Sequence, residues 1–152
     1  MTGTLRLDID SRPECIELLS NALHDICHLT LPVVEIARIN LAMVEAVNNA
    51  VEHAYHGESG HPVWVEFDLT PDHFRLRVCD QGQPMAPGRL AATPELAEPD
   101  PEDPATWSAR GRGLAIIKSC MDTVEYQVQD GINTLTMSRN LITHEPPLGQ
   151  SL

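Results

Sequence analysis

Three polar residues at a four-residue spacing form the first group in this sequence that could do chemistry. Glu45, Asn49 and His53 lie in the segment NLAMVEAVNNAVEHAY, residues 40–55. In an α-helix this spacing places all three on one face. Carboxylate and amide oxygens one turn apart suit a hard cation and its water ligands. The same stripe is also typical of a solvent-facing helix surface, so its interpretation depends on motifs elsewhere in the chain.

Apolar residues in and before this segment define the helix that positions the stripe. Eight of them fall within an arc of roughly 140° on the other side of the helix: Ile36, Ile39, Met43, Val44, Val47, Ala50, Val51 and Ala54. Asn40 is a polar exception inside the arc. Pro32 marks the start of the predicted helix, and Gly57 is expected to end it near His56 in the left-handed conformation. The pattern predicts a long amphipathic helix with one buried face.

A second candidate group, Asp80-Gln81-Gly82, follows a predicted β-hairpin. Residues 63–68 and 74–79 alternate apolar and polar side chains around the turn signal at 70–72, which predicts two antiparallel strands. An Asp at a strand end is often only a turn former. At the floor of a pocket, however, the Asp80 carboxylate would accept a hydrogen bond from an exocyclic amine such as that of adenine. Gly82 would let the base lie flat against the chain.

A third group, Gly111-Arg112-Gly113-Leu114, opens a predicted helix that runs to about Met121. A helix start exposes unpaired N–H groups and a partial positive charge, and glycine lets a phosphate approach them. Two glycines at a helix start are also common for structural reasons alone. Neither the Walker pattern nor the dinucleotide-binding pattern of glycines is present.

Residues 83–110 separate the second and third groups and differ from the rest of the chain in composition. They hold six of the twelve prolines together with a run of acidic residues. Regular structure is not expected there, apart from a turn or two within residues 90–97. A loop of this length in a compact domain is either disordered or a functional lid. We expect a lid over residues 83–110 that is mobile until a ligand orders it.

The remaining elements complete one domain over residues 1–141. We expect a strand at 4–9, a helix from a Ser11 cap to about Leu29, and final strands at 123–128 and 132–141. Residues 142–152, with the pair Pro146-Pro147, are expected to be a disordered tail. The predicted fold class is an α/β two-layer sandwich, with a mixed, mostly antiparallel sheet covered on one face by three helices.

Charge and composition exclude several classes of function. The formal net charge is −12 and Lys118 is the only lysine, so a surface that grips nucleic-acid phosphates is not expected. No apolar run approaches the ~20 residues needed to cross a bilayer. The first residues lack the pattern of a signal peptide, and the four cysteines form no C-x-x-C pair, so a cytoplasmic protein with reduced thiols is expected. His24, Cys27 and His28 are spaced as metal ligands but lack a fourth partner.

The order of the three groups resembles the GHKL ATP-binding fold of gyrase, histidine kinases and MutL. Within that fold the sequence is most similar to anti-sigma factor serine kinases of the RsbW and SpoIIAB kind. The likeness spans about residues 5–141 and is carried by EAVNNAVEHAY from Glu45, DQG from Asp80 and GRGLAIIKSCMD from Gly111. Where the family often has a further glycine before G-x-G, this chain has Arg110.

The resemblance implies a role for each candidate residue. Asn49 would coordinate Mg²⁺ on the ATP phosphates, and Glu45 would be the general base for the incoming hydroxyl. Asp80 would bind the adenine amino group, with Gly82 beside it. The residues implied at the phosphate end, together with the lid, are His53, Arg110, Gly111, Arg112, Gly113 and Leu114.

The resemblance also implies a function in a partner-switching system that regulates transcription. The protein would phosphorylate a serine on a STAS-domain anti-anti-sigma antagonist, and in the other partner state would sequester a sigma factor, as a homodimer. Two alternatives stay open. One is a switch or binding module that holds ATP, or has lost it, and regulates its partner without phosphorylating it. The other is an unrelated acidic scaffold whose glycines only cap helices.

Overall fold

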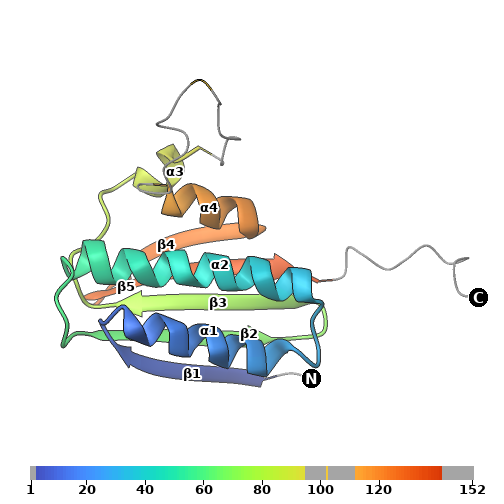
Figure 1. Ribbon diagram of the computed structural model, residues 1–152. Coiled ribbons are helices and arrows are strands. Elements are labelled where there is room, and N and C mark those ends of the chain that lie inside the picture. Colours follow the sequence, from blue (N-terminus) through green and yellow to red (C-terminus); the bar gives the residue numbers. More distant parts are fainter. Residues whose placement is uncertain (1–2, 95–101, 103–111, 142–152) are drawn as a thin grey trace, which may run out of the picture.

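The computed structural model describes residues 3–94, 102 and 112–141, and these form a five-stranded sheet (Figure 1). The strand order is β1-β2-β3-β5-β4, and every described pair is antiparallel. The strands are β1 (Gly3–Asp10), β2 (Pro62–Leu69), β3 (His73–Asp80), β4 (Thr123–Gln129) and β5 (Ile132–Asn140). The predicted strands are therefore confirmed, and the mixed component that the prediction allowed does not occur among the described pairs.

Helices cover one face of this sheet. Figure 1 shows α1 and α2 lying across it, with α4 beside α2. The helical elements are α1 (Glu14–Cys27), α2 (Val33–Asn49), the π-helix η1 (Ala50–Ala54), the short α3 (Arg89–Ala92) and α4 (Gly113–Cys120). No helix within these described ranges is long and apolar enough to span a bilayer. The predicted two-layer architecture is confirmed.

The core lies between the helices and the covered face of the sheet. Alternate residues of β2 and β3 point into it, because successive side chains of a strand face opposite sides. The fully buried large side chains include Leu19, Leu23, Ile39, Met43, Val47, Val63, Val65, Phe67, Phe74, Leu76, Ile117 and Met137. The predicted apolar arc of the central helix supplies Ile39, Met43 and Val47 to this set, and this buried face packs against the sheet.

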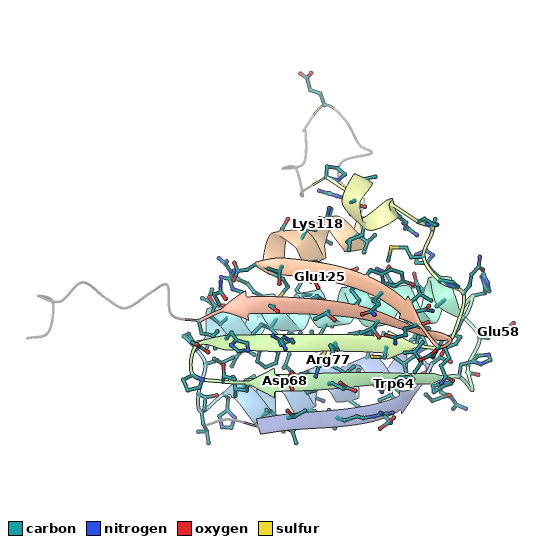
Figure 2. All side chains as sticks on the ribbon, turned by 180° about the vertical axis from the view of Figure 1, so that it is seen from behind. Glu58, Trp64, Asp68, Arg77, Lys118 and Glu125 are labelled. Atoms are coloured by element: carbon teal, nitrogen blue, oxygen red, sulfur yellow. The ribbon has the colours of Figure 1, made fainter. Side chains whose placement is uncertain are left out.

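The other face of the sheet is uncovered and carries charged side chains in pairs (Figure 2). Arg77 donates to Glu66 and to Asp68 at 2.9 Å each. Arg6 lies over the ring of Trp64, with the guanidinium carbon 4.8 Å from the ring centroid. These contacts shield the apolar surface of the strands without a second layer of helices.

The first helix begins differently from the prediction. Ser11 does not cap α1, which starts at Glu14 after Pro13. Its hydroxyl instead donates to the Glu58 carbonyl at 2.6 Å and accepts from the His61 amide at 3.1 Å. The prediction of a Ser11 cap was wrong because the Ser11 side chain forms hydrogen bonds with the backbone that leads into β2 rather than with its own helix.

The central helix ends in a wider turn than expected. Its α-helical part stops at Asn49, and the π-helix η1 continues it, with the Tyr55 amide donating to the Ala50 carbonyl at 3.1 Å. Gly57 has a φ of 77°, which confirms the predicted left-handed end. Asn40, the exception in the apolar arc, has a buried Oδ1 with no hydrogen-bond partner among the described residues.

Candidate functional site

The first turn of α4 contacts the polar stripe of α2. A β-carbon placed on Gly113 would lie 3.0 Å from Glu45 Oε2 and 3.5 Å from Asn49 Oδ1. Two motifs that are far apart in the sequence therefore meet at one point. The amino end of α4 carries unpaired N–H groups and a partial positive charge, so the Glu45 and Asn49 oxygens face an electropositive backbone.

A cavity of about 650 Å³ opens at this junction. Its lining is mostly polar and comprises Glu45, Asn48, Asn49, Glu52, His53, His56, Gly57, Arg89, Gly113 and Leu114. The carboxylate and amide groups and the His53 imidazole come from α2 and η1, His56 and Gly57 follow η1, and Gly113 comes from α4. This chemistry suits phosphate groups accompanied by a hydrated cation.

Glu45 is half-buried at this junction, and its environment favours a proton acceptor. Burial raises the pKa of the Glu45 carboxyl, and the negative charge of Glu52 raises it further. A carboxylate whose pKa is moved toward neutrality is better matched to general-base catalysis than one in open water. The physical setting of Glu45 therefore agrees with the predicted role of base.

Asp80 lies at the end of β3 and is held by a fixed hydrogen-bond pattern. Its side chain is only 8% exposed. Asp80 Oδ1 accepts from Asn133 Nδ2 at 2.7 Å and from the Gly82 amide at 3.0 Å. Within the described residues no hydrogen bond reaches Oδ2, which leaves that oxygen as an acceptor for a ligand. Burial raises the pKa of the Asp80 carboxyl, opposed by these two hydrogen bonds.

A second cavity of about 330 Å³ lies beside Asp80. Its apolar lining residues are Ala46, Ala50, Ala54, Val78, Pro84, Met85, Ala86, Leu114 and Leu135. Tyr126 lines it as well, and its hydroxyl accepts a hydrogen bond from the Met85 amide at 2.9 Å. The apolar part of this lining, with the Asp80 carboxylate beside it, fits a flat heterocycle that carries an amine.

The two cavities are neighbours that share part of their walls. Residues common to both linings are Asn49, Glu52, His53, His56, Arg89 and Leu114. The arrangement is one elongated site, with Asp80 at the apolar end and Glu45 at the polar end. A ligand with an apolar ring at one end and anionic groups at the other would match it.

Gly82 differs from its expected place. It does not line either cavity and instead packs against η1, where an added β-carbon would lie 2.4 Å from the Ala54 carbonyl oxygen. The next residue, Gln83, donates its amide to that same carbonyl at 2.9 Å. The glycine is required because two backbones approach closely there, so the predicted contact of the base with Gly82 is not supported by this geometry.

The other predicted residues are placed as follows. His53 and Leu114 line both cavities and Gly113 lines the polar one, whereas Arg112 lines neither. Arg110, Gly111 and most of the predicted lid lie outside the described residues, as does the predicted tail at 142–152.

Sequence reasoning missed several residues of the site: Glu52, His56, Arg89, Tyr126 and Asn133. Asn133 is opposite Asp80 in the pairing of β3 with β5. The register of those strands was the only signal that could have revealed it, and the sequence does not show which strands pair.

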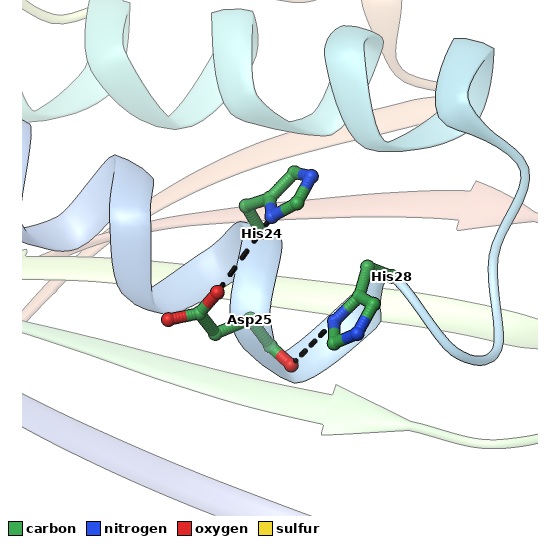
Figure 3. A group of neighbouring side chains, drawn as sticks. All are labelled: His24, Asp25 and His28. Carbon is green, nitrogen blue, oxygen red and sulfur yellow. Dashed lines mark hydrogen bonds and ion pairs between the residues drawn. The ribbon is translucent and has the colours of Figure 1, made fainter.

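The histidines suggested as metal ligands lie at the exposed end of α1 (Figure 3), and they line neither cavity of the site. Asp25 replaces Cys27 in this group, because the Cys27 thiol is fully buried in the core. The rings of His24 and His28 stack at 5.7 Å, and the Asp25 backbone carbonyl lies 3.1 Å from His28 Nδ1. Three exposed ligand groups without a fourth among the described residues do not form a closed metal centre.

Comparison with known proteins finds relatives that are similar over most of the chain. The chain is 24% identical to the serine-protein kinase RsbW of Oceanobacillus iheyensis over 143 residues, which cover 93% of this chain and 89% of the relative. It is 27% identical to RsbW of Bacillus pumilus, covering 93% and 90%. It is 31% identical to the anti-sigma F factor of O. iheyensis over 91 residues, covering 60% and 59%.

The fold also has a counterpart among solved structures. The crystal structure of the RsbU and RsbW domains of a Mycobacterium tuberculosis protein superposes with a TM-score of 0.62 at 22% identity, covering 91% of this chain and 33% of that one. At that identity the superposition shows the fold. The sequence matches the histidine kinase-like ATPase domain over residues 9–139, nearly the whole described domain. The chain therefore belongs to the histidine kinase-like ATPase family.

Proposed function

We propose that this protein is an ATP-dependent serine-protein kinase and anti-sigma factor in a partner-switching system. It phosphorylates a serine on a STAS-domain antagonist and, in its other partner state, sequesters a sigma factor in the cytoplasm as a homodimer. The observation that carries the proposal is the meeting of Glu45 and Asn49 with Gly113 at the amino end of α4. The relatives named serine-protein kinase and anti-sigma F factor support serine as the residue phosphorylated and a sigma factor as a partner.

The donor groups of the elongated site fit ATP with a divalent cation. Asp80 Oδ2 would accept a hydrogen bond from the adenine amine, with the ring in the apolar cavity beside Tyr126. The Asn49 amide oxygen is a hard ligand and would hold Mg²⁺. The bound cation supplies neutralisation of the phosphate charge, which is the main requirement of phosphoryl transfer.

The chain's own groups then handle the proton. Glu45 would take the proton from the serine hydroxyl of the partner protein as that oxygen attacks the γ-phosphorus and ADP leaves. Burial raises the pKa of Glu45 and the negative charge of Glu52 raises it further, which increases the affinity of the carboxylate for the proton it must accept. The amino end of α4 faces the same point and would stabilise negative charge there.

Replacing Glu45 by Ala tests the proposal. The E45A variant should keep Mg²⁺-dependent ATP binding but lose phosphate transfer to a STAS-domain partner by about 10²-fold or more, because the base is removed. Binding is measured by the rise in melting temperature with ATP and Mg²⁺, since a ligand of the folded state stabilises it. Transfer is measured with labelled ATP. E125A is a matched control, because Glu125 is exposed on β4 at the uncovered face of the sheet (Figure 2).

Each contrary outcome has a definite meaning. Transfer by E45A at the wild-type rate would exclude Glu45 as the base. Nucleotide binding by the wild type without transfer to STAS-domain proteins would favour the non-catalytic switch. Failure to bind millimolar ATP in the presence of Mg²⁺ would reject the proposal altogether.

A further inference from the structure

We infer that Arg89, on the short helix α3, binds the phosphates of the nucleotide and sets the preference of the site for di- and triphosphates. This inference rests on the proposed function, because it assigns a residue to the phosphate end of the same site. The starting observation is that Arg89 lines both the apolar and the polar cavity. Arg89 is exposed and therefore lies where the two halves of the elongated site join, within reach of a ligand.

The negative charge of the lining residues shows why a positively charged side chain is needed to bind phosphates there. The carboxylates that line the two cavities are Glu45, Glu52 and Asp80. Among the described lining residues, Arg89 is the one side chain with a permanent positive charge. A polyphosphate would otherwise approach three negative groups with only α4 and a metal ion in its favour.

Arg89 combines a place in the lining of both cavities with the absence of an ion pair among the described residues, whereas Arg38 and Arg75, which also form no ion pair there, line neither cavity. Arg6, Arg12, Arg77 and Arg139 each form an ion pair with a carboxylate. Within the described residues Arg89 forms no ion pair, although it lies beside an acidic site. A guanidinium presents several N–H donors in a planar fork that matches phosphate oxygens, so an unpaired one facing a cavity is suited to an anionic ligand.

Contacts on both sides of α3 hold Arg89 in this place. Before the helix, the Met85 amide donates to Tyr126 on β4 at 2.9 Å. After it, Lys118 Nζ on α4 donates to the Thr93 carbonyl at 2.6 Å. From the same position after the helix, the Thr93 hydroxyl donates to the carbonyl of Arg89 itself at 2.7 Å.

Gly88 and Leu90 also help to position α3. Gly88 has a φ of 77°, which turns the chain into α3, and Leu90 packs against the hydrophobic core. The only lysine of the chain, Lys118, thus anchors α3 to α4, the helix whose first turn faces the phosphate end. The described first part of the predicted lid is therefore attached by hydrogen bonds to both β4 and α4, and Arg89 lies in this part.

The test compares nucleotides that differ only in their phosphates. Dissociation constants for ATP, ADP and adenosine are measured with Mg²⁺ for the wild type, R89A and R89K. R89A should weaken ATP and ADP binding by about tenfold or more, because charge-assisted hydrogen bonds are lost, while adenosine binding changes by less than about twofold. R89K should lie between them, because lysine keeps the charge without the fork.

R75A is the matched control, since Arg75 is exposed on the uncovered side of β3 and should leave all three constants unchanged. Unchanged ATP binding by R89A would overturn the inference, and so would equal loss of ATP and adenosine, which indicates a damaged base cavity. Either result leaves the proposed kinase function standing if the wild type binds ATP. Failure of the wild type to bind any of the nucleotides would instead reject the proposed function itself.

Discussion

At the scale of single residues, the site depends on two carboxylates whose surroundings make ionisation costly. Burial is the first cause of the raised pKa of both Glu45 and Asp80. At Asp80 one oxygen is occupied by Asn133 and the Gly82 amide, and the other is left for a ligand. The protein therefore holds a partly desolvated acceptor in place before the ligand arrives, which is a stability cost typical of functional sites.

The variant D80N should be more stable than the wild type without ligand but weaker in binding. The Asn oxygen can still accept both hydrogen bonds, and no charge is buried. A relief of about 1 kcal/mol corresponds to a rise of about 2–4 °C in melting temperature for a domain of this size. ATP binding should fall by about tenfold or more, because the amide presents a donor toward the adenine amine. Thermal melts and ATP titrations measure both effects.

The pH dependence of this stability difference follows from linkage. The folded pKa of Asp80 is raised, so the folded protein holds this proton more tightly than the unfolded chain. Wild-type stability therefore falls as pH rises from the ordinary Asp pKa of about 3.9 through the raised value. The D80N variant has no ionisable group at this position and so lacks this loss of stability. Its greater stability relative to the wild type should therefore be absent at lower pH and complete above the raised pKa. D25N, at an exposed site on α1, should show no such advantage, and a D80N advantage constant with pH would contradict the assignment.

At the scale of elements, two glycines allow helices to approach their partners, and they do so against different atoms. At Gly82 the nearest atom to an added β-carbon is the Ala54 carbonyl oxygen of η1, at 2.4 Å. At Gly113 it is the carboxylate oxygen of Glu45, at 3.0 Å. Backbone cannot yield without moving a helix, whereas the end of a long side chain can turn aside.

The variants G82A and G113A should separate stability from activity. G82A should lower the free energy of unfolding by about 1–3 kcal/mol, as over-packing does. G113A should change it by less than about 1 kcal/mol. It should nevertheless slow phosphate transfer by about 10²-fold, because a displacement of about 1 Å at a catalytic group is sufficient for such a loss.

Urea unfolding and transfer assays distinguish the two effects. G3A is the control for the added methyl group, since nothing lies within 4 Å of a β-carbon on Gly3. A stable G82A would show that η1 and the β3 end are less tightly apposed than described. A fully active G113A would show that Glu45 need not be held beside α4.

At the scale of the whole molecule, one end of the sheet carries the candidate site and the other end carries an ion pair that connects the sheet to the central helix. The candidate site lies where β3 ends at Asp80. Toward the opposite end, Arg139 of β5 forms two hydrogen bonds with Glu35 of α2, at 2.7 and 3.1 Å. These side chains are only 11% and 13% exposed. The ion pair ties the start of the central helix to the sheet at a distance from the chemistry.

Breaking this ion pair should destabilise the fold without altering the site. R139M removes both Arg139 hydrogen bonds to the partly buried Glu35 and should cost about 2–4 kcal/mol in urea unfolding, whereas E35M/R139M should recover most of that loss. ATP affinity of the double variant should stay within about twofold of the wild type. A comparable loss of affinity in both variants would mean that the two ends of the molecule are coupled.

Some of this architecture was predictable from the sequence because its causes are local. The apolar period of the central helix, the alternation of the β2–β3 hairpin and the left-handed Gly57 depend on neighbouring residues. The Glu45–Asn49 spacing was legible for the same reason, since a helix fixes the relation between residues four apart. The prediction from the sequence was wrong at Ser11. Serine often caps the start of a helix, but the Ser11 side chain forms hydrogen bonds with a segment that is distant in the sequence.

Only the tertiary structure decided how the groups meet. Asp80 and Asn133 are 53 residues apart and Glu35 and Arg139 are 104 apart, and no local preference connects them. They come together because β3 pairs with β5 in one register and α2 packs across both, which is set by burial of the whole core. The place of Gly113 against Glu45, and of Arg89 between the two cavities, depends on the same packing. The sequence by itself determined which groups can do the chemistry, and tertiary packing decided that they face a common space.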